Sequence, residues 1–344
     1  MDADEERPWA GPLAPLLAMP GVTDVLVQEP GVAWIDSGGA LAPVTVDLPD
    51  VEAVRALAVR MAGAGGRRLD DAAPLVDARL PDGTRLHAVL PPLAPDCAAI
   101  SLRSVRARAL DMDDLVASGM VTGPLGRVLR AMVARRLSVL VTGATGSGKT
   151  TLLASLLSLV DPGERLLIIE EAGELRPAHP HVVRLVERRA NIEGSGAVGL
   201  PTLVREAMRM RPDRVVLGEC RGAEVREVLS VFNTGHRGGF ATLHANTPAD
   251  APARLVALGS LAGLDQRTVE LQAAIAFDVV VHVERDAGVR RVARVATLVR
   301  SADASLTAVD ALTWERGRWV EGPAWETLGP RLGVELGAVG LHAA

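Results

Sequence analysis

The feature that most constrains this chain is a glycine-rich turn between an apolar stretch and a stretch of helical length. Residues 137–142 read LSVLVT, an apolar run rich in β-branched residues that is typical of a strand buried on both faces. The next eight residues, GATGSGKT, match G-x-x-x-x-G-K-[ST] in full, and a Leu-rich segment follows. A preceding strand and a following helix distinguish a phosphate-binding loop from a chance match. The sequence therefore predicts a nucleotide site here.

Each part of this motif has a mechanical function. The glycines let successive backbone N–H groups turn inward around a phosphate, at a helix N-terminus whose dipole favours an anion. Lys149 is expected to reach the β- and γ-phosphates, and Thr150 to offer its hydroxyl to Mg²⁺. The expected cofactors are thus ATP and Mg²⁺. The expected nucleotide-binding residues of the loop are Gly143, Thr145, Gly146, Ser147, Gly148, Lys149, Thr150 and Thr151.

The composition of the chain supports the same site. Lysine and arginine total 37 residues, and Lys149 is the only lysine among them. Arginine stands almost everywhere that lysine would be expected, which we attribute to a GC-rich genome. The one lysine occurs where a compact ammonium on a flexible stem cannot be replaced by a planar guanidinium.

The length of 344 residues predicts two domains. Residues 1–103 combine short strands, turn signals and one helical stretch, which is typical of a small α+β domain with an antiparallel sheet. Residues 104–122 are predicted to be a linker that ends at a helix with Thr122 as its N-cap. Residues 123–344 alternate strands and helices, which predicts a parallel α/β domain with nucleotide at the carboxyl ends of its strands and a β-rich C-terminal annex.

The cysteines, the N-terminal residues and the net charge limit where the chain works. Cys97 and Cys220 form neither a plausible disulfide framework nor a metal site, which fits a reducing cytoplasm. The acidic N-terminus has no signal peptide pattern, and the longest apolar run, 151–160, is too short to span a bilayer. Any membrane association is therefore expected to go through a partner. The net charge of −5 argues against a general nucleic-acid binder.

Two apolar strands run directly into glutamates. Residues 164–175 read ERLLIIEEAGEL, and residues 214–221 read RVVLGECR. The glutamates at these two strand ends are Glu170, Glu171, Glu174 and Glu219. Acidic clusters are often only solvated sheet edges. An NTPase, however, needs acids that hold Mg²⁺ and that orient or deprotonate the attacking water, and two such strand ends after a phosphate loop favour this interpretation.

A third block contains two histidines. Residues 233–246 read NTGHRGGFATLHAN, with His236 and His244 eight positions apart. This pair makes no metal site without further ligands, and a lone histidine is more often structural. His244 nevertheless follows a short strand that would end at the same sheet edge as the glutamates. Its ring N–H could sense the γ-phosphate.

These blocks together resemble one family. The phosphate loop, IEEAGEL, RMRPDRVVLGECRGAEV and NTGHRGGFATLHAN occur in the same order in the ring-forming ATPases of type II and type IV secretion and pilus systems. The stretches VTDVLV, DARLPDGTRLHAVLPPLAPD and ISLRSVR are similar to the N-terminal domain of one branch. That branch contains the ATPases of tight-adherence (Tad/Flp) pili and a related conjugal transfer-associated set.

The resemblance implies a RecA-like P-loop core with a parallel-rich sheet, preceded by a smaller α+β domain that closes over the nucleotide. It also implies a cytoplasmic homo-hexamer that associates with the inner face of the cytoplasmic membrane through partners. ATP hydrolysis would power pilus assembly or protein secretion through an inner-membrane platform protein. Neither direct membrane insertion nor nucleic-acid binding is expected.

The resemblance further implies roles for single residues. Glu174 matches the catalytic acid of the acidic stretch, Glu219 the strand-end glutamate, and His244 the histidine of the last block. With Lys149 these are the expected catalytic residues. Glu171 stands where the family usually has aspartate, so the metal or water contact that the family makes there does not carry over directly to this chain. The expected metal ligands are Thr150, Glu171 and Glu219.

Four arginines are also expected at the nucleotide. Arg85 and Arg103 lie where arginines of the N-terminal domain face the nucleotide in this family, and Arg184 and Arg221 match arginines near the subunit interface. Because Arg184 is followed closely by Arg188 and Arg189, these arginines are too many for one site. Arg184 is the one expected to act on the phosphates of a neighbouring subunit.

Three other functions compete with a secretion motor. A DNA-moving ATPase of conjugation or uptake shares the fold, but the chain has no tyrosine and only three phenylalanines for stacking on bases. A small-molecule kinase would need an acceptor pocket, whereas this chain devotes its length to an N-terminal domain. A nucleotide-gated switch without turnover is disfavoured by the paired glutamates. Phosphate release without any acceptor would separate an ATPase from a kinase.

Overall fold

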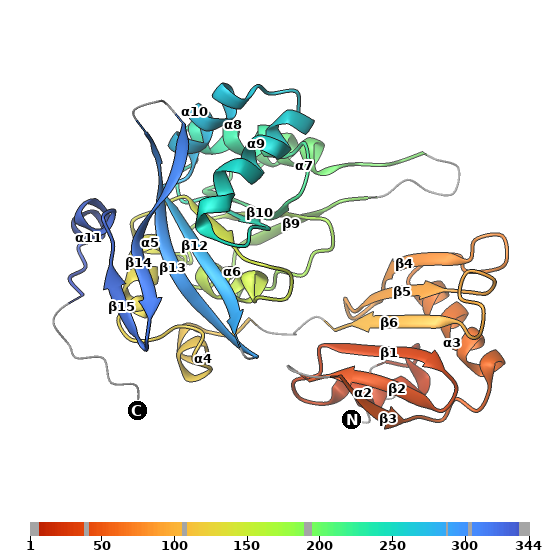
Figure 1. The fold of residues 1–344 in the computed structure, drawn as a ribbon. Helices are drawn as coiled ribbons and strands as arrows, with labels where there is room; N and C mark the ends of the chain where they lie inside the picture. The colour runs from red at the N-terminus through yellow and green to blue at the C-terminus, as the bar shows by residue number, and fades with distance from the viewer. Residues whose placement is uncertain are drawn as a thin grey trace. The chain divides into compact units, whose positions relative to one another are not determined.

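The computed structural model describes residues 7–37, 41–104, 109–188, 195–286, 288–301 and 305–336. The chain forms two units, Met1–Ala107 and Arg108–Ala344 (Figure 1). The first unit has one hydrophobic core, and the second has two, one on each face of its sheet.

The first unit is built on a six-stranded antiparallel sheet in the order β3-β2-β1-β6-β5-β4. Alternate residues are buried in β5 and in the other strands except β3, because one face of the sheet packs against helices in the described part of this unit. Helix α3 begins where the Asp50 carboxylate accepts the Ala53 N–H at 2.8 Å. The elements are η1 (Gly11–Leu13), α2 (Ala14–Ala18), β1 (Asp24–Glu29), β2 (Val32–Asp36), β3 (Leu41–Thr45), α3 (Val51–Ala64), β4 (Leu75–Arg79), β5 (Arg85–Val89) and β6 (Ala99–Arg103).

The second unit is built on a nine-stranded sheet in the order β15-β14-β13-β12-β7-β11-β10-β8-β9. The six strands from β12 to β9 are parallel, and β13, β14 and β15 extend the sheet in antiparallel fashion. The phosphate loop follows β7. The strands are β7 (Val139–Thr142), β8 (Leu166–Glu170), β9 (Val182–Val186), β10 (Arg214–Cys220), β11 (Phe240–Leu243), β12 (Val279–Asp286), β13 (Val289–Arg300), β14 (Leu306–Glu315) and β15 (Arg318–Glu321).

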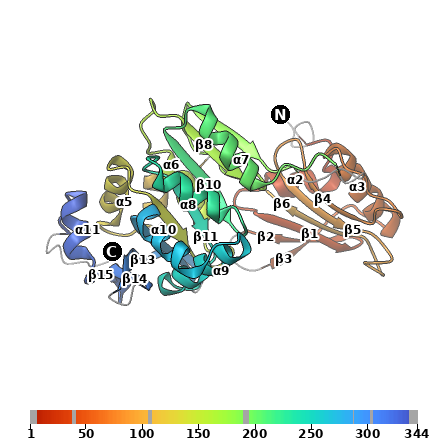
Figure 2. The ribbon, with the colours of Figure 1, turned by 90° about the horizontal axis from the view of Figure 1, so that it is seen from above.

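Helices cover both faces of this sheet, which explains why its central strands are continuously apolar. On β7, Val139 and Val141 pack toward one core and Leu140 toward the other. The first core includes α4 (Met112–Ala117), α5 (Leu125–Ala134), α6 (Lys149–Leu157) and α11 (Trp325–Leu332). The second includes α7 (Leu200–Ala207), α8 (Val225–Asn233), α9 (Ala251–Leu261) and α10 (Gln266–Ala276). Helices α8, α9 and α10 lie side by side in both views (Figures 1 and 2). The predicted fold class, a RecA-like α/β core with a smaller α+β domain, is confirmed.

The segment between the two sheets differs from its prediction. Of the stretch 104–122, residues 105–108 lie outside the described residues, but the rest contains α4, whose Met112 and Leu115 are buried in the core of the second unit. The helix predicted to begin at Thr122 begins instead at Leu125, so Thr122 is not its N-cap. Gly123, with a φ angle of 54°, turns the chain between Thr122 and the helix, and the Trp319 indole of β15 donates a hydrogen bond to the Thr122 carbonyl at 3.1 Å.

No helix in the described part of the chain combines the length and the apolar character that crossing a bilayer requires.

Candidate nucleotide-binding site

The loop after β7 has the backbone that the motif predicts. Gly143, Gly146 and Gly148 have φ angles of 149°, 73° and 106°, values that residues other than glycine rarely adopt. A Cβ atom on Gly143 would lie 2.3 Å from the carbonyl oxygen of Val283 on β12, so only glycine fits there. Gly148 is the N-cap of α6, which opens with Lys149. The tight turn therefore points the N-terminus of α6 toward the inside of the loop.

The loop fits a phosphate group on two further observations. The Ser147 hydroxyl is buried and has no hydrogen-bond partner among the described residues. The α6 N-terminus adds unpaired backbone N–H groups and a favourable dipole. Thr145 and Thr150 are exposed and Thr151 is half-buried. The predicted nucleotide-binding residues of the loop therefore lie on one continuous turn of the backbone.

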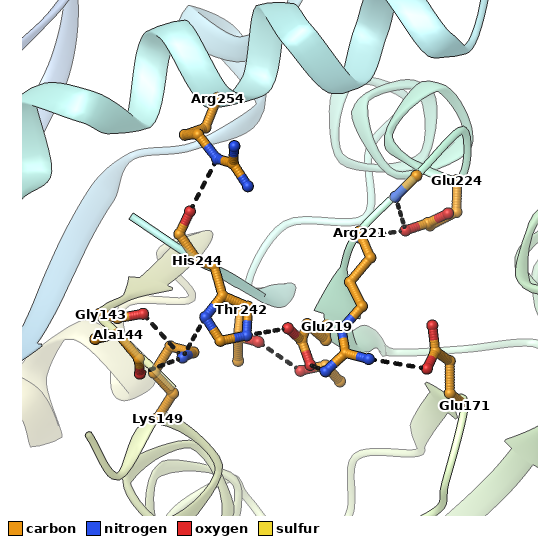
Figure 3. Close-up of polar contacts among 12 residues, drawn as sticks. Gly143, Ala144, Lys149, Glu171, Glu219, Arg221, Glu224, Thr242, His244 and Arg254 are labelled. Carbon is orange, nitrogen blue, oxygen red and sulfur yellow. Dashed lines mark hydrogen bonds and ion pairs between the residues drawn. The ribbon is translucent and has the colours of Figure 1, made fainter. Parts of the chain in front are cut away.

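Lys149 points back across the loop. Its ammonium donates hydrogen bonds to the carbonyls of Gly143 at 2.9 Å and Ala144 at 2.8 Å (Figure 3). Burial lowers the pKa of Lys149, while the nearby Glu219 carboxylate opposes that shift. This buried ammonium would bind an anion more strongly than it binds the two neutral carbonyls.

His244 lies between the lysine and a glutamate. Its Nδ1 is 3.3 Å from the Lys149 ammonium, and its Nε2 lies against the Glu219 carboxylate (Figure 3). Burial lowers the pKa of His244, and the charge of Lys149 lowers it further. The tautomer follows from the partners: an ammonium can only donate, so Nδ1 accepts and the ring proton is on Nε2, which faces the Glu219 carboxylate.

The strand order explains this contact. β11 lies between β7 and β10, so the residue after β11 stands between the loop that follows β7 and the end of β10. Thr242 of β11 also donates to the Gly218 carbonyl of β10 at 2.6 Å. Parallel strands bring their carboxyl ends to one edge, where ligands bind in open α/β sheets. The structure therefore brings Lys149, His244 and Glu219 together as the sequence predicts, although no catalytic role is tested by their position.

Arg221 joins the two glutamates that were expected to bind metal. Its guanidinium lies 2.7 Å from Glu219 and 3.2 Å from Glu171 (Figure 3). The hydrogen bond to Glu219 raises the pKa of Arg221. Arg221 was expected near a subunit interface, and here it contacts the site of its own chain. A metal ion at either carboxylate would compete with this guanidinium.

The acidic turn after β8 is organised by a glutamate to which no role was assigned. The Glu170 carboxylate is buried and accepts the N–H groups of Glu174 at 2.9 Å and Leu175 at 3.0 Å. Burial raises its pKa, which the two backbone donors partly offset. Glu170 therefore fixes the turn that carries Glu171 and Glu174. Its signal in the sequence was its place as the last residue of an apolar strand.

The magnesium ligands predicted from the sequence are Thr150, Glu171 and Glu219. The part of the chain that the structure describes holds no group of three or more His, Cys, Asp or Glu side chains arranged for a metal ion. Mg²⁺ bound with a nucleotide needs only one or two protein oxygens, because phosphates and waters supply the rest. A hydroxyl and a carboxylate are oxygens of this kind, and both glutamates are held by Arg221 in this structure.

The other predicted arginines belong to the first unit and to strand β9. Arg85 and Arg103 are cross-strand neighbours in the first unit. Arg85 pairs with Asp77 at 2.9 Å, and Arg103 with Asp24 at 3.0 Å. Arg184 is exposed on β9, the edge strand of the described part of the second sheet, and Arg189 lies outside the described residues.

Two site neighbours were missed by sequence reasoning. Arg254 of α9 donates to the His244 carbonyl at 3.3 Å (Figure 3), and Arg290 of β13 donates to the Gly146 carbonyl at 3.1 Å. In a chain with so many arginines, no local pattern separates these two from the rest. His282 of β12 gave a signal, a single histidine inside an apolar strand, and it contacts Thr142.

A phosphate loop on a parallel RecA-like sheet, with carboxylates at neighbouring strand ends, places the chain among the P-loop nucleotide-binding proteins. More narrowly, the chain belongs to the type II/IV secretion system protein family, whose model matches residues 6–302.

Similarity to individual proteins supports this family membership. The chain is 49% identical over 319 residues to a putative conjugal transfer protein of Mycobacterium tuberculosis, covering 91% of this chain and 90% of the relative. It is 32% identical over 304 residues to the protein VirB11 of Agrobacterium fabrum, covering 78% and 87%. Among solved structures it is similar in fold to the Legionella pneumophila ATPase DotB, with a TM-score of 0.56, 20% identity and coverage of 92% and 80%.

The position of His244 predicts opposite shifts of its pKa in two variants. Because the charge of Lys149 lowers this pKa and Glu219 raises it, Lys149→Ala should raise the titration midpoint of His244 and Glu219→Gln should lower it. The measurement is an NMR titration of the histidine ring signals, with His244→Gln to assign the resonance. Shifts of the same sign in both variants, or none, would contradict the contacts described here.

Proposed function

We propose that this protein is an ATPase whose turnover powers pilus assembly or protein secretion. The observation that carries the proposal is the contact of His244 with both Lys149 of the phosphate loop and Glu219 of the neighbouring strand. This arrangement places a cation, a ring N–H and a carboxylate together at the end of one loop. Membership in the secretion family and the fit of the loop to phosphate support it.

The residues divide the work of hydrolysis between them. Lys149 exchanges its two carbonyl partners for the β- and γ-phosphate oxygens, with which its hydrogen bonds are charge-assisted and stronger. Glu219 orients or deprotonates the attacking water, and Glu174 serves as a second acid at the adjacent strand end. His244 links the two events, because a phosphate that draws Lys149 forward also changes the partners of the imidazole. Thr150 with Glu171 or Glu219 would hold Mg²⁺, which would neutralise phosphate charge when bound.

The arginines of the first unit have partners that a phosphate would replace. Arg85 and Arg103 each hold an aspartate on adjacent strands. Closure of the N-terminal domain over a nucleotide would offer these guanidinium groups a phosphate with which they form bidentate hydrogen bonds. ATP and domain closure would then favour each other.

The proposed assembly is a homo-hexamer in the cytoplasm that works on an inner-membrane platform protein, as in the Tad/Flp pilus systems whose ATPases the sequence resembles. A second candidate is the movement of DNA in conjugation, because the Mycobacterium tuberculosis relative is named a putative conjugal transfer protein. The sequence has no tyrosine and only three phenylalanines that could stack on bases, which argues against this function. Stimulation of phosphate release by single-stranded DNA would favour conjugation, and no stimulation would favour the pilus motor.

We predict that the purified protein releases phosphate from ATP with no added acceptor. Lys149→Ala should lower this rate at least about 100-fold, because the lysine contacts the transferred phosphate directly. Glu219→Gln should bind an ATP analogue about as well as wild type but hydrolyse ATP about 100-fold more slowly, since the carboxylate acts on the water or metal. The assay is phosphate release, with binding followed by displacement of a fluorescent nucleotide.

A matched control is Glu227→Gln, a change of another glutamate, one that pairs with Arg205 at 2.7 Å. It should retain full turnover. Wild-type turnover in Lys149→Ala would show that the site is wrongly assigned, and phosphate release that requires an acceptor would identify a kinase.

We also predict that nucleotide promotes a ring of six. Arg184 is exposed on an edge strand, where a guanidinium can reach a neighbouring subunit. Light scattering at micromolar concentration with an ATP analogue should give the mass of six copies for wild type and a smaller mass for Arg184→Ala. The control is Arg209→Ala, which removes an exposed arginine that pairs with Glu206, three positions earlier. A wild-type protein that stays monomeric with the analogue would refute the ring.

A further inference from the structure

The hairpin of β12 and β13 touches the phosphate loop at successive points. At the base of the loop, the Thr142 hydroxyl and His282 Nδ1 are 2.8 Å apart, and burial lowers the pKa of His282 to about 4, so the ring is neutral. Next, the Val283 carbonyl fills the space that a side chain on Gly143 would need. The third contact comes from Arg290 of β13, which reaches the middle of the loop. Figure 1 shows the two strands running together along the sheet.

Arg290 makes two kinds of contact with the loop. Its Nε donates to the Gly146 carbonyl at 3.1 Å. Its alkyl stem packs beside Gly148, where an added Cβ would lie 3.3 Å from Arg290 Cδ. Gly148 has no side chain, so the stem lies directly against the loop backbone at this position.

The contact to Gly146 sets the direction of the next N–H group. In a planar trans peptide the carbonyl and the N–H point in opposite directions. Holding the Gly146 carbonyl toward β13 therefore points the Ser147 N–H into the loop, where the Ala144 carbonyl accepts it at 3.3 Å. Lys149 donates to that same carbonyl at 2.8 Å. The N–H and the ammonium thus converge on one position inside the loop.

We propose that Arg290 is a positioning residue for nucleotide binding, which acts by holding the Gly146–Ser147 peptide so that the Ser147 N–H is presented to a phosphate. The proposal rests on the proposed function, because it requires the loop to bind a nucleotide. The group that Arg290 orients belongs to the loop and not to the hydrolytic acids. Its effect therefore falls on the binding of ATP and ADP alike and leaves the chemical step almost unchanged.

The test compares Arg290→Ala with Arg300→Ala, a change of an exposed arginine at the other end of the same strand. ATP-analogue and ADP affinities are measured by displacement of a fluorescent ADP analogue, kcat and KM by phosphate release, and thermal unfolding without nucleotide. For Arg290→Ala we expect roughly 10-fold weaker binding of both nucleotides, the effect of one hydrogen bond to a charged group. KM should rise by a similar factor, while kcat and the unfolding midpoint stay near wild type. Arg300→Ala should match wild type throughout.

Three results would overturn the inference. If Arg290→Ala bound both nucleotides as tightly as wild type, Arg290 would not position the loop. If its unfolding midpoint fell and Arg300→Ala lost affinity equally, the effect would be a general one on strand β13. If wild type itself bound no nucleotide, the proposed function would fail and this inference with it, and the wild-type titration identifies that case.

Discussion

The imidazole of His244, held between the Lys149 ammonium and the Glu219 carboxylate, is the contact on which the site depends. It joins the phosphate loop to the neighbouring acidic strand end through one neutral ring. Because burial and the lysine charge lower the His244 pKa, the ring keeps one acceptor for the lysine and one donor for the glutamate. A second cation in this position would repel Lys149, and an apolar side chain would leave Glu219 without this donor. The neutral ring is therefore what allows a buried lysine and a carboxylate to sit on either side of it.

The sheet supplies the geometry that this contact needs. Placing β11 between β7 and β10 sets His244 between the loop and Glu219, and placing β12 on the other side of β7 brings the hairpin of β12 and β13 against the loop. The loop is thus bounded by acids and a histidine on one side and by Val283 and Arg290 on the other. Helices cover both faces of the sheet, so the ends of these strands are where a ligand can reach it.

Much of this could be predicted from the sequence, because the signals were local. The G-x-x-x-x-G-K-[ST] pattern fixed the turn around Gly143 and Gly148, and apolar runs ending in Glu170 and Glu219 marked the strand ends. The strand order could not be derived from one sequence by periodicity, and neither could the pairing of Arg221 with both Glu171 and Glu219, since each depends on contacts between distant segments. Arg290 lies 144 positions from the carbonyl that it contacts, in a strand with several other arginines. The contact of Trp319 with the Thr122 carbonyl likewise joins segments 197 positions apart.

The most direct test of the account is a structure of this protein with Mg²⁺ and a non-hydrolysable ATP analogue. The account predicts that Lys149 leaves the carbonyls of Gly143 and Ala144 for the β- and γ-phosphate oxygens. It also predicts that the γ-phosphate lies within hydrogen-bond distance of His244, with Glu219 facing the position of the attacking water. An analogue bound outside the loop, or bound in it while Lys149 keeps both carbonyls and His244 and Glu219 turn away, would contradict the central claim.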